Sequence, residues 1–395
     1  MTFATLALLV LVGFAGPLLS ARRAWRIPVI AGELAAGLAI GSTGFGWVDP
    51  GEPTFTLFAQ LGFGLIMLVI GSHIPIRDTA VRAAVGRGAA GAAIVAIVAV
   101  ALGIGTALLF GTSHGAVYAV LIASSSAALV LPMLQSLDIA PDSAAQLIAQ
   151  IALADVACIV ALPLVLQPQR VPLVALGGVG IAVVGVLLVV VLRRIGAHRL
   201  HVLHEVSESR EFALELRFSL LALFGLAGIA QFTHVSVMMA GFTLGLVLSA
   251  VGQPRRLARQ LFGMTEGFFG PLFFVWLGAS INLRDLGPHP QMILLGLVLG
   301  AAAVIAHLAG RATGLPWAHA VASAGQLGVP VAAVALGVET RTLLPGEGAA
   351  ILLGALVAVV ASSAAVAVVS RRAAASSAHS DQSSGPQAPP QAASS

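Results

Sequence analysis

Long apolar stretches alternate with short polar connections along almost the whole chain, up to residue 370. A helix needs about 20 apolar residues to cross a hydrocarbon core of roughly 30 Å. Thirteen such stretches lie at about 2–20, 27–46, 54–72, 88–111, 115–136, 144–166, 172–192, 212–232, 235–252, 264–281, 289–310, 317–338 and 349–370. The second, ninth and tenth are the weakest, being short or rich in glycine. The pattern predicts an all-α polytopic membrane protein with about 13 transmembrane helices.

Composition supports this class, because 58% of the residues are hydrophobic and only 9% are charged. No soluble globular domain has such a balance. The high isoelectric point, about 10.8, comes from arginines in the loops and calls for no nucleic acid as a partner. The chain has one cysteine, Cys158, so an internal disulfide framework is excluded.

The arginines predict the orientation. All 20 basic residues are Arg, and with the N-terminus outside, 17 of them fall in inner loops or the inner tail. The exceptions are Arg170, Arg284 and Arg341. Because cytoplasmic loops carry the excess of positive charge, we expect the N-terminus outside and the C-terminus in the cytoplasm. This alternation also favours an odd number of helices.

Three pairs of segments repeat in the same order in the two halves. Residues 71–78 (GSHIPIRD) resemble 278–285 (GASINLRD) at an offset of 207, and 29–42 resemble 237–250 at an offset of 208. Residues 122–132 resemble 320–330 at an offset of 198. Since the third and tenth helices cross in opposite directions, the repeat is inverted, with six helices in each half, a common arrangement in secondary transporters.

These boundaries divide the chain into a transmembrane domain, 1–370, and a Ser/Ala/Pro/Gln-rich tail, 371–395, that we expect to be disordered and cytoplasmic. Within the domain, the first repeat covers about 1–166, the connecting helix 172–192 and the second repeat about 212–370.

The fifth and twelfth helices are expected to be broken and to cross near the membrane midplane. Each carries a proline, Pro132 or Pro330, at equivalent positions. Proline removes a backbone donor and clashes with the preceding turn, while serines and Gln326 can satisfy the freed backbone groups. The alternative is an ordinary proline kink in each helix.

Asp155 is the one acid in the middle of a clear membrane span, 144–166. A buried carboxylate there is costly and usually faces an ion pathway, where it can hold a proton or a small cation but not both well. The alternative is pairing with an arginine, yet no arginine lies mid-membrane. His307, also inside a span, is either a satisfied core residue or a proton-sensitive partner.

The chain resembles the monovalent cation:proton antiporters of the sodium/proton exchanger superfamily, in the branch related to potassium-efflux antiporters. The resemblance covers nearly all of residues 3–370. It rests on RIPVIAGELAAGLAIGSTGFG at 26–46, LGFGLIMLVIGSHIPI at 61–76, ASSSAALVLPML at 123–134 and GPLFFVWLGASINL at 270–283.

This resemblance implies a mobile core, a scaffold that forms a homodimer, and elevator-like alternating access in a bacterial inner membrane. The transported ions would be Na⁺ or K⁺ and H⁺, with no cofactor. Asp155 matches the position of the ion-binding aspartate. The expected supporting residues of the cavity are Ala154, Ser124, Ser125, Ser126, Gln150, His307 and Gln326.

Several positions depart from the family pattern. Ala154 stands where a polar residue is usual, His307 where some electrogenic members have lysine, and Gln326 where the second broken helix has glutamate. A single acid favours electroneutral exchange. Two alternatives stay open, a non-transporting membrane sensor or partner subunit and a sodium-coupled organic anion symporter. We expect no enzyme, since no metal-ligand cluster or activated nucleophile is evident.

Overall fold

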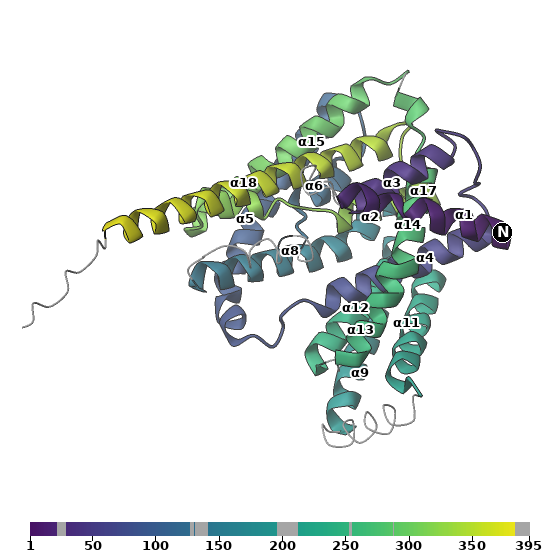
Figure 1. The fold of residues 1–395 in the computed structure, drawn as a ribbon, viewed down its shortest axis with the longest axis horizontal. Helices are drawn as coiled ribbons and strands as arrows, with labels where there is room; N and C mark the ends of the chain where they lie inside the picture. The colour runs from purple at the N-terminus through teal and green to yellow at the C-terminus, as the bar shows by residue number, and fades with distance from the viewer. Residues whose placement is uncertain are drawn as a thin grey trace, which may run out of the picture.

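The computed structural model describes residues 1–21, 29–126, 130, 141–195, 212–252, 255–286 and 288–383. All regular elements in these ranges are helices (Figure 1). They are α1 (Phe3–Gly13), α2 (Ala15–Ser20), α3 (Val29–Ile40), α4 (Pro53–Ser72), α5 (Thr79–Phe110), α6 (Gly115–Ala123), α8 (Pro141–Leu166), η1 (Pro168–Arg170), α9 (Val171–Ile195), α11 (Leu214–Phe232), α12 (Val237–Val251), α13 (Arg255–Met264), η2 (Thr265–Phe269), α14 (Gly270–Ser280), η3 (Leu283–Leu286), α15 (Gln291–Leu308), η4 (Ala309–Thr313), α16 (Trp317–Ala322), α17 (Gly328–Thr340) and α18 (Glu347–Ser383).

Each of the thirteen expected spans has a helix at its place. Within the described residues, nine helical segments are long and apolar enough to cross a membrane. The remaining four expected spans correspond to α3, α6, α12 and the α16–α17 pair, which are shorter or interrupted. The chain is therefore an all-α polytopic membrane protein.

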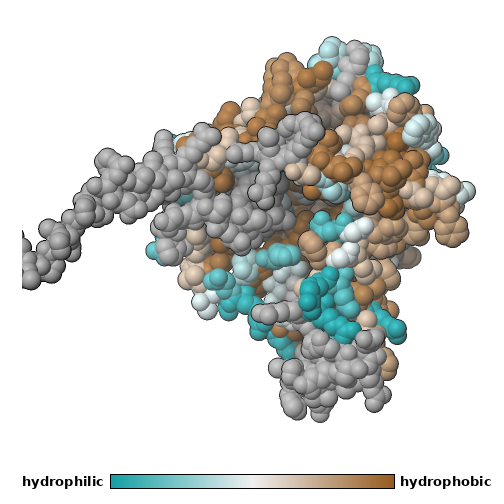
Figure 2. Space-filling model, in the orientation of Figure 1, coloured by the Kyte–Doolittle hydropathy of each residue, from teal (hydrophilic) through white to brown (hydrophobic). Residues whose placement is uncertain are grey.

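The surface fits a lipid environment. Large apolar side chains are exposed along α5 and α9, for example Leu108 at 78% and Leu176 at 67%. In Figure 2, apolar side chains cover much of the visible face, and polar ones gather in its lower half. Because a folded chain in water would bury such residues, their exposure indicates contact with hydrocarbon.

Glycines let four helices approach at equivalent places in the two halves. A methyl group at Gly37 in α3 would overlap the carbonyl oxygen of Val275 in α14, and one at Gly245 in α12 would overlap that of Leu68 in α4. Gly37 and Gly245 are separated by 208 residues, and Leu68 and Val275 by 207. The α3–α14 and α4–α12 contacts are thus the pair that an inverted repeat predicts.

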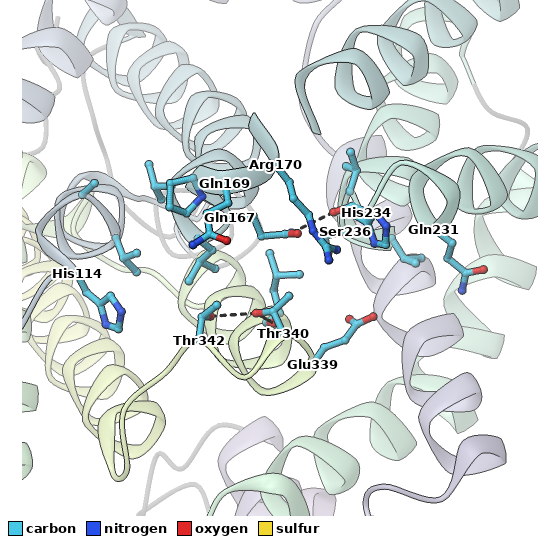
Figure 3. A pocket seen from close by; sticks show the side chains of 18 of the residues that line it. His114, Gln167, Gln169, Arg170, Gln231, His234, Ser236, Glu339, Thr340 and Thr342 are labelled. Atoms are coloured by element: carbon cyan, nitrogen blue, oxygen red, sulfur yellow. Dashed lines mark hydrogen bonds between the residues drawn. The ribbon is translucent and has the colours of Figure 1, made fainter. Parts of the chain in front are cut away.

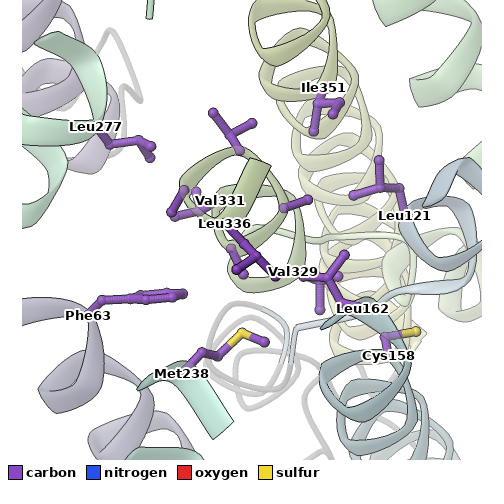
Figure 4. Packing of buried hydrophobic residues seen from close by; sticks show 14 of the residues in the cluster. Phe63, Leu121, Cys158, Leu162, Met238, Leu277, Val329, Val331, Leu336 and Ile351 are labelled. Carbon is purple, nitrogen blue, oxygen red and sulfur yellow. The ribbon is translucent and has the colours of Figure 1, made fainter. Parts of the chain in front are cut away.

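The main hydrophobic cluster surrounds α17 (Figure 4). Val331 and Leu336 of α17 pack among apolar residues from α4, α6, α8, α14 and α18, including Phe63 and Leu162. The second half of the broken twelfth helix is therefore held by apolar contacts from several helices, which position the break that precedes it.

The last helix is longer than expected. α18 continues to Ser383, thirteen residues past the boundary at 370. Alanine-rich sequence such as RRAAASSAHS has high helix propensity, which explains the extension. In Figure 1 this end of α18 projects away from the other helices. Residues 384–395 lie outside the described ranges, as do 196–211 of the connecting loop.

Candidate functional site

Two interrupted helices meet and exchange hydrogen bonds. α6 ends at Ala123, and the backbone turns extended at Ser124 (φ −72°, ψ 148°). α16 ends at Ala322, and α17 begins at Gly328. The break expected in the twelfth span is therefore present, and the fifth span stops being helical at Ser124 as expected; most of its continuation, 127–129 and 131–140, lies outside the described residues.

The hydrogen bonds across this crossing provide partners for backbone polar groups that the interrupted helices leave unpaired. The backbone N–H of Ser126 donates to the Gly325 carbonyl at 2.9 Å. The Ser125 hydroxyl donates to the Ser323 carbonyl at 2.6 Å. The Ser124 hydroxyl donates to Gln326 Oε1. Since unpaired backbone groups are costly inside a membrane, each break stabilises the other.

The role expected of the prolines needs correction. Pro330 does not lie in the break, which covers residues 323–327, but in the first turn of α17, where it is buried. The N–H groups of a first turn have no intrahelical partner, so proline is tolerated there. Pro330 therefore helps to begin the second half-helix. Pro132 lies outside the described residues.

Asp155 lies on α8, next to this crossing. Its side chain is buried, at 3% exposure, and so is that of Ala154. Ala154 and Gln150 line a narrow gap together with Ser125 of the first break, Ser323 of the second, and His307 of α15. The gap leaves no room for a water molecule. The structure thus gathers Ala154, Gln150, Ser125 and His307, four of the expected supporting residues, around one gap, and Asp155 directly follows Ala154 on α8 without lining it.

Gln150 and His307 are packed tightly in this gap. The Gln150 side chain lies against Gly91, where a methyl group would overlap its Oε1. That oxygen is buried and has no hydrogen-bond partner. The His307 ring is 1% exposed, and its Nδ1 lies 2.8 Å from the Ala303 carbonyl of its own helix. A buried amide oxygen without a donor is an available acceptor in this gap.

A cavity of about 440 Å³ opens on one side of the crossing. We call it the Ser126 cavity, because Ser126, Leu327 and Gly328 of the two breaks line it. Two acids also line it, Glu33 of α3 and Glu266 of η2. Glu33 lines this cavity although only 3% of it is exposed.

A larger cavity, about 870 Å³, opens at the other end of the same helices (Figure 3). We call it the His114 cavity. Its wall includes His114, Arg170, His234 and Glu339, none of which was predicted from the sequence to be a site residue. The cavity ends at Val117 and Leu336, more than one turn from either break. As far as the described residues go, Asp155 lines neither cavity.

An all-helical membrane fold with two interrupted helices crossing beside a buried carboxylate defines a secondary transporter class. Comparison with known families places residues 6–372 in the family described as sodium/hydrogen exchanger, transmembrane. The chain therefore belongs to this family, which consists of transporters rather than enzymes.

Individual relatives agree with this assignment. The chain is 21% identical over 376 residues to the putative Na(+)/H(+) antiporter YjbQ of Bacillus subtilis, covering 90% of this chain and 61% of that protein. It is 28% identical over 96 residues to the high-affinity Na(+)/H(+) antiporter NhaS3 of Synechocystis, covering 24% and 21%. The chain thus matches less than two thirds of the length of either relative.

Solved structures show the same fold. The sodium proton antiporter MjNhaP1 of Methanocaldococcus jannaschii, determined at pH 8, matches with a TM-score of 0.64 at 18% identity, covering 93% of this chain and 98% of that one. An electron-microscopy structure of the same antiporter gives a TM-score of 0.66 at 17% identity, covering 94% and 98%. At this identity the likeness concerns the fold.

Proposed function

We propose that the chain exchanges a monovalent cation, Na⁺ or K⁺, for a proton at Asp155 by alternating access. The observation that carries this proposal is the burial of the Asp155 carboxylate beside the crossing of the two interrupted helices. Family membership and the relatives, which are named as Na⁺/H⁺ antiporters, support Na⁺ and H⁺, and K⁺ rests on the sequence resemblance to potassium-efflux antiporters.

The chemistry follows from competition at one carboxylate. A proton neutralises Asp155, and a small cation neutralises it equally, so one leaves when the other binds. The Ser125 hydroxyl and Gln150 Oε1 line the gap beside Ala154, and these oxygens would complete a cation's oxygen shell once the gap opens. One charge in each direction makes the exchange electroneutral.

The two cavities suggest the state of the transporter. With the orientation expected from the arginines, the Ser126 cavity opens to the cytoplasm and the His114 cavity to the outside. The Ser126 cavity reaches the breaks, whereas the His114 cavity ends short of them. The arrangement is therefore inward-facing, and the cation reaches Asp155 past Ser126 and Leu327. We further propose a homodimer in a bacterial inner membrane.

A vesicle assay tests the function. Purified protein in proteoliposomes that contain a pH-sensitive dye receives a pulse of Na⁺, K⁺ or Li⁺, and dequenching reports cation-driven proton movement. Asp155→Asn should abolish the signal. Asp142→Asn is the matched control, because Asp142 lies at the start of the same helix and is exposed. Its signal should stay near that of the wild type.

Exchange at wild-type rate by Asp155→Asn would overturn the proposed role of this residue. Absence of exchange by the wild type with every cation and pH would instead favour a non-transporting sensor or partner subunit. Ala154 and the closed gap at Asp155 are the observations that favour this second candidate. Sodium-driven uptake of a labelled organic anion would identify a symporter.

A further inference from the structure

A buried carboxylate far from Asp155 holds a histidine at the wall of the His114 cavity. Glu347, the first residue of α18, is fully buried. Its Oε1 accepts a hydrogen bond from the Tyr118 hydroxyl at 2.6 Å and lies 2.7 Å from His114 Nδ1. Its Oε2 accepts from the Leu344 backbone N–H at 2.7 Å. Three groups therefore converge on one carboxylate.

This arrangement suits an ionised carboxylate and a histidine that gains a proton. An ionised carboxylate only accepts hydrogen bonds, and Tyr118, Leu344 and His114 each offer a donor. When Nδ1 of the imidazole donates to Glu347, Nε2 is the ring atom left to accept a proton. The His114 side chain is 18% exposed, and its ring stands at the edge of the cavity (Figure 3).

We propose that His114 and Glu347 form a proton-binding site, separate from Asp155, that sets the charge of the His114 cavity. A hydronium ion in the cavity transfers its proton to Nε2 of His114 and is left as water, so one O–H bond breaks, one N–H bond forms, and the product is an imidazolium–carboxylate ion pair. Histidine is the side chain whose charge ordinarily changes between pH 5 and 8. The ligand of this site is the proton itself.

The charges around the cavity show what this proton changes. Among the lining residues, Arg170 contributes one positive charge and Glu339 one negative charge, and the buried Glu347 carboxylate behind His114 adds a second negative charge. With His114 and His234 neutral, these three charges sum to minus one, which attracts cations to the cavity. A proton on His114 brings the sum to zero.

Other helices that pack on α6 leave this sum unchanged. α5 carries Arg82 and Arg87 and α15 carries His307, all at the opposite ends of those helices from His114. α8 carries Asp155 halfway along its length. α17 contributes Glu339, which is already included in the sum.

The consequence for transport rests on the proposed function. A cation that enters from this side loses the attraction of one unit charge. At about 10 Å and an effective dielectric constant of about 20 to 80, this lowers its local concentration about two- to fifteen-fold. Uptake from this side should therefore fall on acidification more steeply than competition at Asp155 predicts.

Histidine titration by NMR tests the proton site without any transport. Ring signals of protein labelled with [13C]histidine are followed from pH 5 to 9, and His114→Gln identifies the signal of His114. That signal should titrate, and Glu347→Gln should move its midpoint to lower pH. His234→Asn is the control, because His234 lines the same cavity at a positive φ that Asn tolerates.

Tyr118→Phe gives a second test if Glu347→Gln does not fold. Without the Tyr118 hydroxyl, Glu347 Oε1 loses one donor and interacts more strongly with a protonated His114. The titration midpoint of His114 should therefore move to higher pH. A His114 signal that does not titrate between pH 5 and 9 overturns the proposal. So does a midpoint that neither Glu347→Gln nor Tyr118→Phe moves.

Transport then separates this inference from the proposed function. In oriented proteoliposomes, His114→Gln should flatten the dependence of cation uptake on the pH at the His114 side, and wild-type steepness in this variant would refute the link to cation entry. If the NMR signal titrates as expected while the wild type shows no exchange, the proton site stands and the proposed function fails.

Discussion

The close approach of α3 to α14 makes Gly37 sensitive to a single methyl group. Gly37→Ala places that methyl on the carbonyl oxygen of Val275, which is backbone and cannot turn aside. Overpacking of this kind costs about 1–3 kcal/mol, and a backbone obstacle favours the upper part of that range. Alanine in place of glycine returns up to about 1 kcal/mol in helix propensity. The expected net loss is about 2 kcal/mol.

Two further variants serve as a matched test and a control. Gly245→Ala places its methyl on the Leu68 carbonyl at the equivalent position of the other half, so its loss should match that of Gly37→Ala. Gly180→Ala, in the middle of α9, meets nothing within 4 Å and should be neutral or slightly stabilising.

Thermal unfolding of detergent-solubilised protein, followed by tryptophan fluorescence, measures these differences. At about 2 °C per kcal/mol, Gly37→Ala should melt about 4 °C below the wild type. Trp276 reports on this interface, because it lies on α14 and donates its indole N–H to the Pro50 carbonyl at 2.9 Å. If the melting temperature of Gly37→Ala equals that of Gly180→Ala, α3 and α14 do not approach as closely as described.

Three other outcomes are expected. The Glu52 carboxylate caps α4 by accepting a hydrogen bond from the Phe55 N–H, which lowers the pKa of Glu52 from 4.5 to about 2. Its stabilising effect is therefore complete above pH 4.5 and is lost as the pH falls through 2. The stability of Glu52→Gln should lack this dependence on acid pH, and identical acid-unfolding curves for the variant and the wild type would contradict the prediction. Gln326→Ala removes the bond to Ser124 and should cost about 1 kcal/mol in chemical unfolding, whereas Gln169→Ala, at an exposed position, should cost nothing measurable. Electroneutral exchange predicts no cation-dependent transient current on a solid-supported membrane. Such a current would show that a net charge moves in each cycle, which would couple transport to voltage at about 2.3 kcal/mol per 100 mV.

The fold was accessible from sequence because a bilayer leaves few solutions. Length and hydropathy identify spans, and the offset of about 207 residues located Gly71 and Gly278 at equivalent contacts, Gly71 against Phe242 and Gly278 against Leu34. Small residues mark such places because only they allow backbones to touch. The bounds of the short helices α3 and α12 could not be predicted from the sequence, since their ends depend on packing more than on hydropathy.

The site was only partly accessible. The break regions were found through their prolines, yet the helix stops ahead of Pro330, because proline fits a first turn better than an unwound segment. Asp155 was conspicuous as an acid in an apolar span. His114 and Glu347 were not, since 233 residues separate them and both fall at helix ends, where polar residues need no explanation. Such pairs become visible only when the chain has folded.

The hydrogen bonds between the two breaks limit which segments can be exchanged between family members. Ser124, Ser125 and Ser126 are bonded to Gln326, Ser323 and Gly325, so neither half carries a complete set of partners. A chimaera that takes its first half from one family member and its second half from another combines two break segments that evolved with different hydrogen-bond partners. Residues 124–126 and 323–326 should therefore be exchanged as one unit.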